Sequence, residues 1–157
     1  MAQATVLGIR RYFTKEGTDP YEMFSWVERD SKIDNPVTGK IAFEQKSVEF
    51  PDTWSLNAIN IVSQKYFSGT PGTKDREASL KTLINRVADT ITRHGEQEGY
   101  FDDNKQAETF NAELKYILTS NEPPSTALFG LILAPKNVLS KPAPALFWQL
   151  MTQCPQF

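Results

Sequence analysis

The cysteine and the histidine of this 157-residue chain are each the only residue of their kind, and they are the side chains best suited to redox or metal chemistry. A single thiol, Cys154, can neither form a disulfide nor complete a cysteine-rich zinc site within one chain. His94 has no second histidine as a co-ligand, and its place at the end of a predicted helix suits a cation at the negative end of the helix dipole. We therefore interpret Cys154 as an unpaired cysteine and His94 as a surface helix cap, and we predict no metal ligands.

Two short motifs resemble phosphate-binding or acid–base groups. Residues 69–74 read GTPGTK, which lacks the GxxxxGK spacing and the preceding strand of a phosphate loop, so a turn is the better interpretation. Asp102 and Asp103 could form a carboxylate pair, but adjacent acids before a helix more often cap its N-terminus. We expect neither motif to be catalytic.

Three aromatic residues, Trp54, Tyr66 and Phe67, could line a nucleotide-binding groove. Aromatic side chains at helical spacing are more often part of a core, and we interpret them in that way. The sequence therefore predicts no catalytic, cofactor-binding or metal-binding residues in this chain.

A hairpin and a first helix are predicted to precede the longer helices. Aromatic and β-branched residues on both sides of the turn sequence NPVTGK predict a β-hairpin over about residues 24–50, although the apolar alternation is imperfect. Asp52 and Ser55 are candidate N-caps for a helix that ends at the sequence SGTPG. Because this helix is apolar around most of its girth, we expect it to be buried.

The clearest periodicity predicts a helix over about residues 75–94, ended by Gly95. Its apolar residues share one face: Leu80, Leu83, Ile84, Val87 and Ile91. A third helix should begin at Asp103 or Asn104 and end near Ser120, again with one apolar stripe. These elements predict an α+β, mostly helical fold. The apolar faces of its helices could form a core of their own or one side of a larger protein's core.

Composition limits the partners and the location of the chain. Seventeen basic and nineteen acidic residues give a net charge of -2, which provides no overall field for nucleic acid or an anionic membrane. The apolar run at residues 127–134 is much shorter than the roughly 20 residues that cross a bilayer. The first residues also lack a secretory apolar segment. We expect a cytoplasmic protein with neither a membrane nor a nucleic-acid partner.

The sequence changes character at Pro123. All nineteen acidic residues precede it, and Lys136 and Lys141 are the only charges that follow. Six of the ten prolines lie in this tail, which has no sustained helical or strand periodicity. We therefore predict one domain over residues 1–122 and a poorly ordered, association-prone tail over residues 123–157.

The region before the tail resembles a known family over a continuous stretch from Arg10 to about Asn121. The stretch contains RRYFTKEGTDPYEMFSWVERDSKI, IAFEQKSVEFPDTWSLNAINIVSQKYFSGTPG, LINRVADTITRHGEQEGYF and FNAELKYILTSN. Its most specific parts are RYFTKEG, FEQKSVEFPDTWS and NIVSQKYF. These segments are similar to the start of class II, adenosylcobalamin-dependent ribonucleotide reductases.

The resemblance implies a fragment of a larger α/β barrel enzyme that makes deoxyribonucleotides from ribonucleoside diphosphates. In that family, cobalamin homolysis generates a thiyl radical, and a cysteine pair supplies the reducing electrons. The full-length enzyme would use adenosylcobalamin, a ribonucleotide substrate and a dithiol reductant, and would form a homodimer. The present chain has a single thiol, so we expect it to bind no cofactor and to be inactive alone.

The tail is explained by a change of reading frame. The family continues with AAFNSPVWFN, a substrate-cradling segment, and then with a segment bearing a redox cysteine, whereas this chain continues with PPSTALFGLIL. Codons compatible with the tail, read from the third base of each codon, give AFNSPVWFNIGTKERAQQASACF. Phe129 followed by Gly130 permits only Trp or Arg in the shifted frame, and the family has Trp. We therefore predict that residues 123–157 are out of frame.

Two functions of different classes follow. In the first, the chain is an inactive N-terminal fragment of a reductase. In the second, it is a small binding or regulatory module that uses its proline-rich apolar tail to dock a partner. The coding DNA discriminates between them, because a single-base change that opens a long FNSPVWFN-containing frame supports the first.

Overall fold

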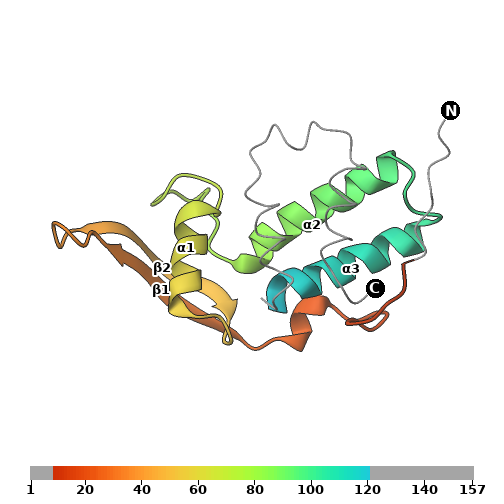
Figure 1. The fold of residues 1–157 in the computed structure, drawn as a ribbon, viewed down its shortest axis with the longest axis horizontal. Helices are drawn as coiled ribbons and strands as arrows, with labels where there is room; N and C mark the ends of the chain where they lie inside the picture. Colours follow the sequence, from red (N-terminus) through yellow and green to blue (C-terminus); the bar gives the residue numbers. More distant parts are fainter. Residues whose placement is uncertain (1–8, 121–157) are drawn as a thin grey trace. The chain divides into compact units, whose positions relative to one another are not determined.

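The structure is a computed structural model that describes residues 9–120. Its elements are η1 (Pro20–Met23), β1 (Trp26–Asp34), β2 (Ile41–Pro51), α1 (Leu56–Lys65), α2 (Leu80–Gln97) and α3 (Asn104–Ser120). The predicted α+β fold, a hairpin followed by three helices, is confirmed. In Figure 1, α1 lies against the hairpin, and α2 and α3 run side by side. The tail prediction and Cys154 lie outside the described residues, and no helix within residues 9–120 is long and apolar enough to cross a membrane.

A bulge in the hairpin explains its imperfect apolar alternation. Strands β1 and β2 are antiparallel, and the register shifts between Arg29, which faces Val48, and Ser31, which faces Gln45. Ser47 has a φ of 51°, and its N–H donates to the Asp30 carboxylate at 3.0 Å. The extra residue moves the buried side of β2 from odd positions, such as Phe43, to even positions, such as Val48.

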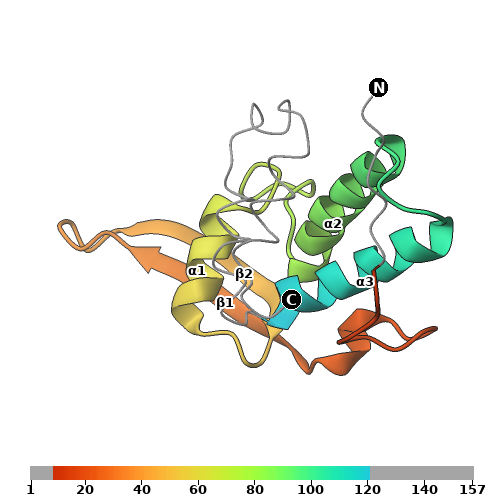
Figure 2. The ribbon, with the colours of Figure 1, turned by 45° about the vertical axis from the view of Figure 1, so that its right-hand side comes forward.

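Helix α1 packs on the hairpin through one face, so the expectation that this helix is buried holds for that face alone. Ile59 and Val62 are buried, whereas Leu56 is 52% and Ile61 44% exposed. Within the described part of the chain, only the hairpin side of α1 receives a covering layer. Figure 2 shows α1 lying across the two strands.

Two polar side chains fix the start of α1 and its position on the hairpin. Ser55, and not Asp52, is the N-cap of α1, and its hydroxyl accepts from the Ala58 N–H at 3.3 Å. The Asn60 amide donates to the Lys32 carbonyl at 2.9 Å and accepts from the Lys32 N–H at 3.1 Å, as a neighbouring strand residue would. This pairing holds α1 against the outer edge of β1.

Helix α2 starts later and ends later than predicted. Its N-cap is Ser79, because the preceding residues form a turn against β2 that includes a bridge between Glu49 and Ser79. Gly95 does not end the helix: it lies inside α2, where an added Cβ would meet the Phe101 ring at 2.7 Å. The end is a Schellman motif at Gly99, whose φ is 70° and which is followed by a 2.9 Å bond from the Tyr100 N–H to the Gly95 carbonyl.

An arginine holds the connection between α1 and α2. The Arg76 guanidinium donates to the carbonyl of Ser63 in the last turn of α1, and to those of Phe67 at 2.6 Å and Gly69 at 2.8 Å in the connection that follows. Its Nε donates to the Gln45 side chain at 3.2 Å. Arg76 therefore satisfies one carbonyl that the end of the helix leaves unpaired and two carbonyls of the following connection.

We expect Arg76→Lys and Arg76→Ala each to lower the free energy of unfolding by about 2 kcal/mol, because one ammonium cannot replace a planar guanidinium that reaches three carbonyls. Urea unfolding followed by circular dichroism measures the change. Wild-type stability of the lysine variant would contradict this assignment.

Candidate functional site

The structure accounts for the sequence-predicted residues as structural parts. Residues 69–74 form a turn, as predicted. The Asp103 carboxylate caps α3 by accepting from the Gln106 N–H at 2.8 Å, and Asp102 accepts from the Gln106 side chain at 3.4 Å. His94 lies in the last turn of α2, as predicted. No group of candidate metal ligands occurs within residues 9–120.

The aromatic residues are core, with one exception. Trp54 is 2% and Phe67 5% exposed, and their rings lie 5.5 and 5.7 Å from the Phe50 ring. The Trp54 indole donates to the Thr119 carbonyl at 2.9 Å, which ties the connection between β2 and α1 to the last turn of α3. Tyr66 is only half-buried and forms the C-cap of α1. None of the three lines the polar pocket between η1, α2 and α3.

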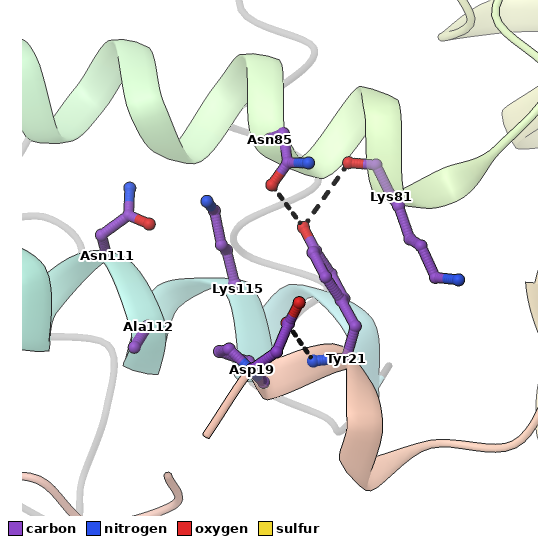
Figure 3. A pocket seen from close by; sticks show the side chains of 8 residues that line it. Asp19, Tyr21, Lys81, Asn85, Asn111, Ala112 and Lys115 are labelled. Atoms are coloured by element: carbon purple, nitrogen blue, oxygen red, sulfur yellow. Dashed lines mark hydrogen bonds between the residues drawn. The ribbon is translucent and has the colours of Figure 1, made fainter. Parts of the chain in front are cut away.

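A polar pocket of about 480 Å³ lies between η1, α2 and α3 (Figure 3). It is lined by Asp19, Pro20, Tyr21, Lys81, Asn85, Asn111, Ala112 and Lys115. The Tyr21 hydroxyl donates to the Asn85 Oδ1 at 2.9 Å, and Asp19 accepts from the Tyr21 N–H at 2.9 Å. Burial raises the pKa of the Tyr21 hydroxyl well above its usual value, so it remains protonated.

Both ammonium groups of this pocket are already paired. Lys81 Nζ lies 2.7 Å from Glu49 and 4.1 Å from the centre of the Trp26 ring. Lys115 Nζ lies 3.0 Å from Asp89. Burial opposes ionisation of Asp89, but the hydrogen bonds and charges around it outweigh burial and lower its pKa.

The pocket therefore offers hydrogen-bonding groups, but none of its lining residues is a cysteine, serine or histidine that could act as an activated nucleophile or general base. Pockets of about 300–1,000 Å³ accommodate drug-sized ligands. A corrin macrocycle with its nucleotide and adenosyl groups is much larger than such ligands. The residues of this pocket do not fit adenosylcobalamin.

The sequence analysis did not identify Glu113, a carboxylate that accepts four hydrogen bonds in the described region. Glu113 of α3 is 8% exposed, and it accepts from the N–H groups of Tyr12 at 3.2 Å, Phe13 at 2.9 Å and Thr14 at 2.8 Å. The Thr14 hydroxyl donates to it at 2.5 Å. The signal was available, because Glu113 follows Phe110 by three positions and so interrupts the predicted apolar stripe of this helix.

Comparisons with known proteins agree on one family. A family described as class II vitamin B12-dependent ribonucleotide reductase matches residues 27–121. The vitamin B12-dependent ribonucleotide reductase of Streptomyces avermitilis is 46% identical over 116 residues, which are 74% of this chain and 12% of that protein. The enzyme of the same name from Streptomyces coelicolor is also 46% identical, over 112 residues that cover 71% of this chain and 12% of the relative.

A more distant relative shows the same pattern. The vitamin B12-dependent ribonucleotide reductase of Rhodopirellula baltica is 36% identical over 108 residues, which are 68% of this chain and 10% of that protein. The chain thus spans about one-eighth of the length of the Streptomyces relatives. Since the match extends over more than half of the chain, this protein belongs to the class II vitamin B12-dependent ribonucleotide reductase family.

Proposed function

We propose that this chain is the N-terminal portion of a cytoplasmic ribonucleoside-diphosphate reductase that uses adenosylcobalamin, and that it is inactive by itself. The observation that carries the proposal is the 46% identity to a vitamin B12-dependent reductase of which the chain spans only 12%. The remainder of such an enzyme would bind the substrate, the cofactor and the dithiol reductant. It would also form the contacts of a homodimer. The alternative of a regulatory module has no comparable support.

The chemistry of the family supports the inactivity. Each ribonucleotide reduction consumes two electrons from thiols and needs a further thiol to form the thiyl radical, whereas the 157 residues contain one cysteine. The role left to the described residues is structural. They form a hairpin and a set of three helices.

We expect the purified chain, mixed with adenosylcobalamin and a dithiol, to reduce neither ribonucleoside diphosphates nor triphosphates and to show no thiyl radical signal. Product chromatography and electron paramagnetic resonance measure the two outcomes. Deoxyribonucleotide formation by this polypeptide alone would refute the inactivity.

A chimera tests the positive part of the proposal. Residues 1–121 replace the matching segment of the Streptomyces avermitilis reductase, and ribonucleotide reduction is compared with that of the unmodified enzyme. We expect the chimera to be active because the two segments are 46% identical. A folded but inactive chimera would refute the assignment. Sequencing of the coding DNA tests separately whether residues 123–157 are out of frame.

A further inference from the structure

Four aromatic side chains form a patch along one face of α3. The Phe13 ring stacks on the Tyr116 ring at 5.1 Å, the Phe24 ring lies 5.1 Å from Tyr116, and the Tyr12 ring meets Phe13 edge-on at 4.7 Å. We call Tyr12, Phe13, Phe24 and Tyr116 the aromatic patch. Tyr12 is 78% and Phe13 37% exposed.

Hydrogen bonds to α3 fix the backbone of the two exposed residues of the patch. Glu113 accepts the N–H groups of both Tyr12 and Phe13, so their backbone is fixed although they belong to an irregular segment. An ion pair of 2.9 Å between Glu16 and Lys105 joins the same segment to the first turn of α3. Aromatic side chains on a fixed backbone lose little conformational freedom on binding, which is how binding anchors gain affinity.

The position of the patch indicates what covers it. Tyr116 lies one turn before Ser120 on α3, so the two residues share a face of the helix. The family match continues to residue 121, and the relatives extend for most of their length beyond the segment they share with this chain. In those reductases the following polypeptide therefore departs next to the aromatic patch.

We propose that the aromatic patch is the docking surface for the body of the reductase that follows this segment in the full-length enzyme, with the exposed ring of Tyr12 as its principal anchor. This inference rests on the proposed function. Beyond the proposed function, it identifies the surface through which the N-terminal portion is held. The partner surface should be apolar, because the patch offers ring faces and edges and a single kind of polar atom, the tyrosine hydroxyl.

The chimera described above allows a direct test. Tyr12→Ser is introduced into the chimera and into the isolated 157-residue chain, with Val37→Ser as the matched control, since Val37 is 91% exposed at the hairpin tip. In the chimera we expect Tyr12→Ser to accelerate thermolysin cleavage near residue 121 about tenfold, the effect of truncating an interface anchor, and Val37→Ser by less than about twofold. In the isolated chain both substitutions should leave the Tm almost unchanged.

Each alternative result counts against the inference. Equal cleavage rates for the two variants would place the docking surface elsewhere. A loss of Tm in the isolated chain on Tyr12→Ser would make the residue structural, and self-association of the isolated chain that Tyr12→Ser abolishes would make the patch a homodimer contact. A chimera that reduces ribonucleotides but shows no Tyr12 effect contradicts only the docking surface, whereas one that does not fold contradicts both proposals.

Discussion

Replacing Gly69 by alanine should destabilise the protein by about 3 kcal/mol, because strain and a backbone clash add at one position. Gly69 has a φ of 86°, which an L-amino acid adopts at a cost. An added Cβ would lie 2.3 Å from the Asp75 carbonyl oxygen and 2.9 Å from the Arg76 Cα. This neighbour cannot recede easily, because the Glu77 N–H is bonded to the Ser68 carbonyl at 3.0 Å and Arg76 donates to the Gly69 carbonyl.

Gly72 provides the matched control within the same turn. Its φ of 83° is nearly the same as that of Gly69, but an added Cβ meets no atom within 4 Å. Gly72→Ala should therefore cost only the strain of the left-handed conformation, about 1 kcal/mol. Urea unfolding of the two variants separates the clash from the strain, and equal losses would show that the close approach at Gly69 is relieved in solution.

Glu113→Ala should cost about 3–4 kcal/mol and release residues 12–14 from α3. The substitution removes the acceptor of three backbone N–H groups and the Thr14 hydroxyl, and each donor left buried without a partner costs about 1–3 kcal/mol. Hydrogen exchange at the amide groups of Phe13 and Thr14, together with the unfolding free energy, measures both effects. Persistent protection of those amides in the alanine variant would contradict the role assigned to the carboxylate.

The same carboxylate should make stability depend on pH. Burial raises the pKa of Glu113, but the hydrogen bonds from Phe13, Thr14 and Tyr12 outweigh burial and hold it below its ordinary value of 4.5. The contribution of this group is therefore fully present above about pH 4.5 and is lost as the pH falls toward the lowered native pKa. Wild type and Glu113→Gln compared between pH 3 and pH 7 should show a stability difference that is constant at high pH and shrinks in acid.

Local periodicity and cap chemistry determined which elements form, because they depend on neighbours a few residues apart. The apolar positions from Leu80 to Ile91 predicted α2, and Ser55 and Asp103 marked two helix starts that the structure retains. The residue types of the turn at 69–74 and of the capping acids also excluded sites that a motif search alone would suggest. The family resemblance from Arg10 to about Asn121 was readable from residues alone, and the comparisons confirm it.

Only the tertiary structure decided what depends on residues far apart in the chain. Gly95 is of a residue type that often ends helices, yet it lies inside α2, where the Phe101 ring packs on it. Apolar residues around most of the circumference of α1 predicted that the helix is buried. Which of its side chains are exposed depends on which other elements pack against it, and the local sequence does not encode that packing. Glu113 meets its partners 99 to 101 residues earlier in the chain. The bonds that hold the N-terminal segment, and with it the aromatic patch, thus follow from the fold and not from any motif.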